Sequence, residues 1–235
     1  MNLKLDSESF TARKLSWQAR RAYQEQFKDN ELMDFATKED NSFLKIAALI
    51  LTVADGATYQ PSQFIAFFKC SMCNESVSAT GLAKIPKNDT SSRQIKVENF
   101  NPPVPLFPLS DTTPSSINEE LLSSFNHFFS DTCSSGNRLR RAVEKLCLEL
   151  GYIRGRHLYH NIEAMAEEYP QEARWLQSLR LVGNEATHAD QVTEDDLLDS
   201  YKVFEVVLDI FRRKYIEPEI EKVAIQLHDK HKKTN

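Results

Sequence analysis

The chain of 235 residues contains only four cysteines, only six glycines and no long uncharged apolar run. Four cysteines are too few to hold a chain of this length together by disulfides, so we expect reduced thiols and no structural disulfide. The low glycine content leaves helix interiors largely uninterrupted. The longest apolar stretch, residues 43–53, includes Lys45 and has about half the length of a membrane span, which argues against a transmembrane helix there.

The sequence also lacks a large excess of one charge. Its 29 Lys and Arg residues and 34 Asp and Glu residues give a net charge of −5, so any contact with nucleic acid must be local. A content of 41% hydrophobic and 27% charged residues is close to that of soluble globular domains and excludes a chain that is disordered throughout. The first ten residues carry no apolar segment typical of a secretory signal, so we expect a cytoplasmic protein without a membrane partner.

The pattern of apolar residues predicts an α+β chain, mostly α, in three segments. Residues 1–86 are expected to hold an N-terminal helix followed by a small β region. Residues 87–114 collect five prolines among Ser, Thr, Asn and Asp, which disfavours helices and central strands and predicts a linker. The helix is expected within residues 9–29 and the strands within residues 43–53, 63–69 and 75–85, the last two forming a hairpin.

Residues 115–235 are predicted to form a helical bundle. One of the two serines that open this segment can cap a first helix, and Gly151 is placed to end a second helix that begins near Gly136. The sequence Thr193-Glu-Asp-Asp196 is typical of the start of a long final helix. We expect Pro218 to separate that helix from a short terminal one.

The segment from Ser178 to Asp190 contains the groups best suited to act on a phosphodiester. On a continuous helix, steps of four residues advance only about 40° around the axis, so Arg180, Asn184 and His188 share one face. A histidine there can move the proton of a ribose 2′-hydroxyl, while the arginine holds the phosphate and the asparagine positions both. The structural alternative is a surface arginine, a helix-end asparagine and a histidine bonded to a carboxylate such as Asp190.

Two further sets of basic residues are candidates for binding nucleic acid. The first set is Arg140 and Arg141, for which a helical salt bridge with Glu144 or a cap on a facing helix is the structural alternative. The second set follows Gly151, and the acids after it make a solvated surface the alternative there. Its members are Arg154, Arg156, His157 and His160.

The sequence Cys70-Ser-Met-Cys73 lies between two predicted strands, which is the setting of a zinc knuckle. Structural zinc needs four ligands, and residues 1–69 contain neither Cys nor His. Cys133 and Cys147 are distant in sequence, and Cys147 occupies an apolar helix position. We therefore expect no cofactor, with structural zinc at Cys70 and Cys73 as the weaker alternative. Three aromatic side chains are expected to hold the hairpin instead: Phe64, Phe67 and Phe68.

Two segments carry a resemblance to a known family. Asn-Arg-Leu-Arg-Arg-Ala-Val-Glu-Lys-Leu-Cys at residues 137–147, and Leu-Arg-Leu-Val-Gly-Asn-Glu-Ala-Thr-His at residues 179–188, resemble the bacterial family catalogued as domain of unknown function 4145. The resemblance covers roughly the last half of the chain. That family is similar to the HEPN superfamily, helical-bundle proteins that often dimerise. The superfamily includes metal-independent ribonucleases of toxin, restriction and anti-phage systems, which use an Arg and a His.

The resemblance implies a homodimeric protein of a bacterial defence or conflict system, with RNA as substrate and Arg180, Asn184 and His188 as catalytic residues. Seven residues separate Arg180 from His188, and Leu181 follows the arginine, a spacing longer than is usual in that superfamily. This departure keeps a second function open, a non-catalytic dimeric interaction or sensing module that binds a protein partner in a defence or restriction complex. A third is a nucleic-acid-binding accessory that uses the face from Arg138 to Arg156.

Overall fold

The computed structural model describes residues 3–16, 58–88, 92–155, 157–188 and 192–232. The chain divides into two compact units, residues 1–102 and residues 103–235. The predicted strand at residues 43–53 and most of the predicted N-terminal helix lie outside the described residues.

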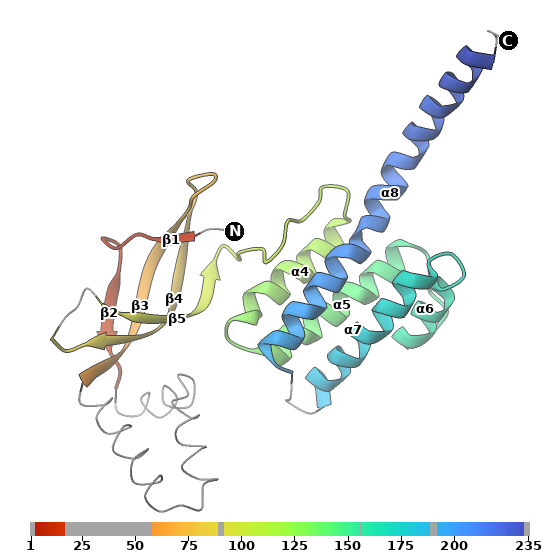
Figure 1. Cartoon of the computed structure of the whole chain (residues 1–235). Coiled ribbons are helices and arrows are strands. Elements are labelled where there is room, and N and C mark those ends of the chain that lie inside the picture. Colours follow the sequence, from red (N-terminus) through yellow and green to blue (C-terminus); the bar gives the residue numbers. More distant parts are fainter. Residues whose placement is uncertain (1–2, 17–57, 89–91, 156, 189–191, 233–235) are drawn as a thin grey trace, which may run out of the picture. The chain divides into compact units, whose positions relative to one another are not determined.

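The first unit contains an antiparallel sheet of five strands (Figure 1). Strand β3 pairs with β4 on one side and with both β1 and β2 on the other, while β5 extends the sheet beyond β4. The predicted hairpin is confirmed, because β3 and β4 pair along their whole length and the Cys70–Cys73 turn joins them. The strands are β1 (Leu3–Leu5), β2 (Thr11–Lys14), β3 (Tyr59–Cys70), β4 (Ser76–Pro86) and β5 (Gln94–Asn101).

Three predictions for this unit are corrected by the structure. Thr11–Lys14, expected to be helical, forms strand β2 because these residues pair with β3. Gln94–Asn101, expected to be linker, forms β5, and the prolines that suggested a linker all follow this strand. Phe67 does not pack with Phe64 and Phe68, because side chains alternate along β3 and 48% of Phe67 is exposed on the other face.

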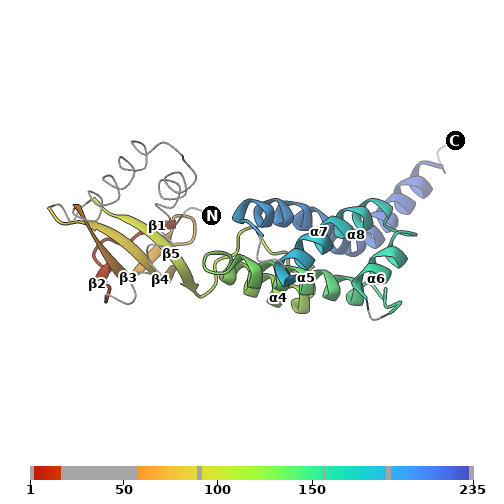
Figure 2. The ribbon, with the colours of Figure 1, turned by 90° about the horizontal axis from the view of Figure 1, so that it is seen from below.

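The second unit consists of helices packed around one core (Figure 2). The predicted α+β class is confirmed, and the described strands and the described helices lie in separate units. Every helix contributes a completely buried apolar side chain, namely Phe125, Leu146, Ile162, Leu176 and Phe204 in chain order. The helices are α4 (Ser115–Phe128), α5 (Thr132–Glu149), α6 (Leu158–Met165), α7 (Pro170–His188) and α8 (Glu194–Lys232).

The ends of these helices follow local capping signals in most cases. Asp131 caps α5 by accepting a hydrogen bond from the backbone N–H of Ser134 at 2.9 Å, so this helix starts before the predicted Gly136. Gly151, with φ of +84°, lies just beyond the end of α5 as predicted. The expected capping box of α8 is confirmed, since Asp196 and Thr193 exchange backbone-to-side-chain bonds of 3.0 and 3.1 Å.

Two predicted helix ends are wrong. Neither Ser115 nor Ser116 caps α4, because the capping position is occupied by Pro114, which has no side chain able to accept a hydrogen bond. Pro218 does not end α8, which continues through it to Lys232. Pro218 has no N–H to donate to the carbonyl of Lys214, and the helix nevertheless continues on both sides of it.

Candidate functional site

Helix α7 carries the predicted catalytic residues. It is continuous from Pro170 to His188, so Arg180, Asn184 and His188 follow one another at four-residue steps, as the sequence predicts. The side chain of His188 is outside the described part of the chain, and its position on the helix is fixed by the backbone alone.

Asn184 contacts Arg140 of helix α5. The Nη1 atom of Arg140 donates a hydrogen bond to Oδ1 of Asn184, and its Nε atom lies 3.4 Å from Oε1 of Glu144. The Arg140 side chain remains 29% exposed. The expected helical salt bridge is therefore present, and one member of the predicted nucleic-acid-binding set lies beside one member of the predicted catalytic set.

Glycines allow α5 and α7 to approach closely at this point. A Cβ atom placed on Gly183 would lie 2.8 Å from the Cβ of Arg140, and one placed on Gly136 would lie 2.8 Å from the Cβ of Ala186. Both distances are shorter than carbon atoms tolerate. Because Gly183 has no side chain, Arg140 can lie across α7 and reach Asn184.

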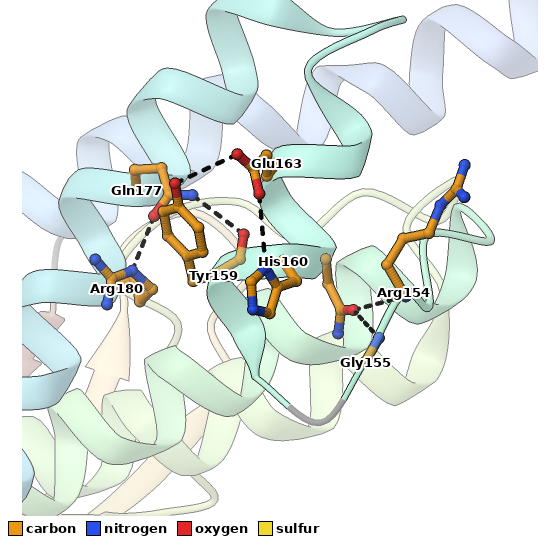
Figure 3. Close-up of polar contacts among 8 residues, drawn as sticks. Arg154, Gly155, Tyr159, His160, Glu163, Gln177 and Arg180 are labelled. Atoms are coloured by element: carbon orange, nitrogen blue, oxygen red, sulfur yellow. Dashed lines mark hydrogen bonds and ion pairs between the residues drawn. The ribbon is translucent and has the colours of Figure 1, made fainter.

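The side chain of Arg180, a residue of α7, contacts Gln177 of the same helix and Tyr159 of α6 (Figure 3). Its Nε atom donates to Oε1 of Gln177 at 2.8 Å, and its guanidinium carbon lies 5.6 Å from the ring centre of Tyr159. The Nε2 atom of Gln177 in turn donates to the backbone oxygen of Tyr159 at 3.3 Å. Sequence analysis missed both partners: Gln177 could have been found one turn before Arg180, whereas no sequence signal links Tyr159 to this helix.

We call Arg140, Tyr159, Gln177, Arg180 and Asn184 the α7 strip. It presents two guanidinium groups, two amides that are each bonded to one of them, and an aromatic ring that is 44% exposed. Arginines bind phosphate oxygens in pairs of hydrogen bonds, and exposed aromatic rings stack on unpaired bases. The strip therefore has the groups needed to contact an RNA strand.

The histidines near the strip are solvent-facing. Nδ1 of His160 lies 3.6 Å from Oε2 of Glu163, and Tyr159 donates its hydroxyl to the same carboxylate at 3.4 Å (Figure 3). His157 occupies the capping position of α6 but makes no side-chain capping bond. Glu163 is therefore the charge partner of His160.

Arg154, another predicted nucleic-acid-binding residue, lies apart from the strip (Figure 3). The backbone N–H groups of Arg154 and Gly155 bond to Oδ1 of Asn161 at 2.9 and 3.2 Å, which anchors their loop, and the Arg154 side chain points away from Arg180 (Figure 3). Arg156 lies outside the described residues.

Arg141 has a packing partner on helix α4. It contacts Oε1 of Glu120 at 2.9 Å, and Arg138 contacts Oε2 of the same carboxylate at 3.1 Å. Only 10% of the Glu120 side chain is exposed, so its charge requires these two partners. This arrangement ties α5 to α4 and leaves Arg140 as the member of its pair that faces α7.

The cysteine hairpin belongs to no group of three or more potential metal ligands among the residues that the structure describes. Hydrogen bonds from the backbone N–H groups of Cys73 and Met72 and from the Cys73 thiol lower the pKa of Cys70. Cys147 is fully buried, and burial raises the pKa of its thiol to about 12. Within the ranges that the structure describes, no three His, Cys, Asp or Glu side chains are grouped so as to hold a metal ion.

The lowered pKa of Cys70 and the raised pKa of the buried Cys147 predict the order in which the thiols react. Under native conditions we expect a disulfide reagent such as dithionitrobenzoate to modify Cys70 and Cys73 first, because the thiolate is the reactive form and both lie at the hairpin tip. Cys147 should react only after unfolding. Mass spectrometry of timed samples measures this, and Cys147→Ser provides the control that should leave the fast phase unchanged. Native labelling of Cys147 as fast as Cys73 would contradict the buried position described.

None of the helices described here is both long enough and apolar enough to cross a membrane. Residues 123–234 match the model of the family described as Domain of unknown function (DUF4145). The matched residues include the whole α7 strip, and the match confirms this part of the resemblance inferred from the sequence. No curated protein and no solved structure matches the chain.

Proposed function

We propose that the helical unit is a HEPN-like bundle that binds RNA along the α7 strip and cleaves it without a metal ion. The observation that supports this function best is the bond from Arg140 to Asn184, which adds a second guanidinium to the face of α7 that carries Arg180. His188 follows Asn184 by four residues on the same helix. The proposed setting is a homodimer in the bacterial cytoplasm that acts in a defence or conflict system.

The proposed chemistry assigns each group a role. The imidazole of His188 takes the proton of a ribose 2′-hydroxyl, the 2′-oxygen attacks the adjacent phosphorus, and the bond to the 5′-oxygen breaks. A water molecule protonates the leaving 5′-oxygen, and the imidazolium of His188 returns its proton to the solvent. Arg180 and Arg140 stabilise the negative charge that builds on the phosphate oxygens. The products are a 2′,3′-cyclic phosphate and a 5′-hydroxyl. Asn184 is a positioning residue in this scheme, because its oxygen holds Arg140.

Two features make unpaired RNA the expected substrate. The reaction requires a 2′-hydroxyl as nucleophile, which DNA lacks. The exposed ring of Tyr159, beside Arg180, offers a surface on which an unstacked base can lie, and such stacking is worth about 1–3 kcal/mol per base. The net charge of the chain makes binding depend on these local contacts.

The test is cleavage of total RNA and tRNA by the purified full chain in excess chelator, with the new ends mapped. We expect cyclic phosphate ends from the wild type, no cleavage by His188→Ala, and about a hundredfold slower cleavage by Arg180→Ala because one charge-stabilising group is lost. Arg174→Ala is the matched control, since Arg174 is an exposed arginine of the same helix outside the strip. It should cleave like the wild type.

Three results would count against the nuclease. These are cleavage that persists in both His188→Ala and Arg180→Ala, cleavage that stops when the chelator is added, and equal losses in Arg174→Ala and Arg180→Ala. A further outcome is that the protein binds RNA without cleaving it, and that of the three variants only Arg180→Ala weakens this binding. That outcome would support the RNA interface and refute the catalytic role of His188.

A second candidate function is a non-catalytic interaction module that binds a protein partner of a defence or restriction complex. It is favoured by the exposed apolar side chains at the end of α8, among them Ile220, Val223 and Leu227. In that case His188→Ala and Arg180→Ala should leave partner binding unchanged.

A further inference from the structure

The turn between β3 and β4 holds two cysteines three residues apart. It lies at one end of the sheet and joins strands that pair as far as Lys69 and Ser76 (Figure 1). The backbone N–H of Asn74 bonds to the carbonyl of Cys70 at 3.0 Å, which closes one turn of helical type, and Asn74 has φ of +60°. Cys70 and Cys73 therefore lie on the same side of this turn.

Three donors converge on the sulfur of Cys70. They are the backbone N–H groups of Met72 and Cys73 and the thiol of Cys73. Successive N–H groups that point at one atom stabilise a negative charge there, so the turn favours a thiolate at Cys70. The hydrogen bond from the Cys73 thiol also places the second sulfur beside the first.

The two cysteines differ in exposure. Side chains alternate along β3, and Cys70 continues the buried row of Phe64 and Phe68 to the end of the strand, where it is partly exposed. Cys73 is exposed, as is every residue from 71 to 76. The turn can therefore change its shape without moving the core residues of the sheet.

This geometry is close to that of a disulfide. Cβ atoms three residues apart on a helical turn lie about 5–6 Å from each other, and a disulfide needs about 3.5–4.5 Å. The turn must therefore tighten by about 1 Å, which its exposed residues allow. Exposed disulfides are the labile ones, so a bond formed here is readily reduced again.

We propose that Cys70 and Cys73 form a reversible redox site that exchanges with low-molecular-weight disulfides such as oxidised glutathione. The site is a dithiol in the structure, where all four cysteines are free. The other two cysteines, Cys133 and Cys147, belong to α5 in the helical unit. The proposal concerns the sheet unit and does not depend on RNA cleavage.

The exchange has two steps. The sulfur of Cys70 loses its proton to the solvent and attacks one sulfur of oxidised glutathione, whose disulfide breaks, and one glutathione leaves as a thiolate that takes a proton from water. The thiol of Cys73 then gives its proton to the solvent, its sulfur attacks that of Cys70, and the bond to the second glutathione breaks. In total the two protein thiols lose two electrons and two protons, which the two glutathione molecules gain.

The test is incubation of the purified full chain with oxidised and reduced glutathione at varied ratios, with a chelator present so that no metal ion holds the thiols. Alkylation after acid quenching and unfolding, followed by mass spectrometry of peptides, counts the thiols and locates each disulfide. We expect the wild type to lose two of its four thiols, joined as a disulfide between Cys70 and Cys73, and to recover both in dithiothreitol.

Two variants test the second step. Cys73→Ser should retain one glutathione on Cys70, because the thiol that displaces it is gone. With reduced glutathione kept well below millimolar, we expect its release at least about tenfold more slowly than from the wild type, since an adjacent thiol acts at a millimolar effective concentration. Cys133→Ser is the matched control, because Cys133 is also partly exposed but lies in the other unit. It should oxidise like the wild type, and circular dichroism establishes that both variants are folded.

The outcomes that would overturn the site come first from the wild type, so they do not depend on the folding of a variant. Four thiols that stay reduced at the highest ratio of oxidised to reduced glutathione would overturn it. So would stable mixed disulfides with glutathione on both cysteines, a disulfide that links two chains, or one that includes Cys133 or Cys147. Equal release of glutathione from the wild type and from Cys73→Ser would refute the role of Cys73 and thus the exchange pair.

Discussion

Replacing Phe125 by alanine is expected to lower the free energy of unfolding of the helical unit by about 3–5 kcal/mol. The side chain is completely buried on α4, and its ring meets the rings of Phe107 at 5.1 Å and Tyr201 at 5.0 Å. Alanine would leave a cavity at the point where α4, α8 and the segment before α4 join, and the two remaining rings cannot fill it without leaving their own contacts.

Urea unfolding followed by far-ultraviolet circular dichroism measures this loss, because the signal is dominated by the helical unit. Leu148→Ala is a suitable control, since Leu148 is 48% exposed on α5 and should change stability by no more than about 0.5 kcal/mol. A loss below about 1 kcal/mol for Phe125→Ala would mean that the core is not packed as described.

Gly183→Val is expected both to destabilise the helical unit, by about 1–3 kcal/mol, and to weaken RNA binding. The new Cβ would lie 2.8 Å from the Cβ of Arg140, so α5 and α7 must separate. Separation breaks the bond between Arg140 and Asn184 and removes one guanidinium from the α7 strip. Gly183→Ala should be milder, because the gain in helix propensity of about 1 kcal/mol offsets part of the strain.

Gly155→Val is the control for this experiment, because a Cβ at Gly155 meets no atom within 4 Å. Unfolding by urea gives the stability change, and fluorescence anisotropy with a labelled unstructured RNA gives the binding change. If Gly183→Val retained wild-type stability, the close approach of α5 and α7 would be refuted. If it lost stability but bound RNA normally, Arg140 would have no place in the interface.

Elements with local signals were predictable from the sequence. The β3–β4 hairpin follows from two β-rich runs around a tight turn, and the start of α8 follows from the capping box at Thr193 and Asp196. Strand β2 was not predictable, because Thr11–Lys14 is extended only through its pairing with β3, more than forty residues away in sequence. The passage of α8 through Pro218 was not predicted, because a proline inside a helix costs about 3 kcal/mol and usually ends it.

The candidate site also has a part that the sequence predicts and a part that depends on contacts distant in sequence. The four-residue steps of α7 place Arg180 and Asn184 on one face, which the sequence alone establishes. The partner of Asn184 is 44 residues away on α5, and the ring beside Arg180 comes from α6. Such contacts depend on how the helices pack, and in particular on the small size of Gly183, so no spacing rule could have identified them.

The exposed end of α8 also bears on how long the protein survives in a cell. The helix has 39 residues and is therefore about 58 Å long, with its first half anchored in the core and its second half open to solvent. Exposed helix ends open locally and are the first places where proteases cut. Arg212, Arg213 and Lys214 open this exposed half, and a protease that cuts after basic residues would trim the chain there. Any molecule that covered the exposed half would thus lengthen the lifetime of the chain.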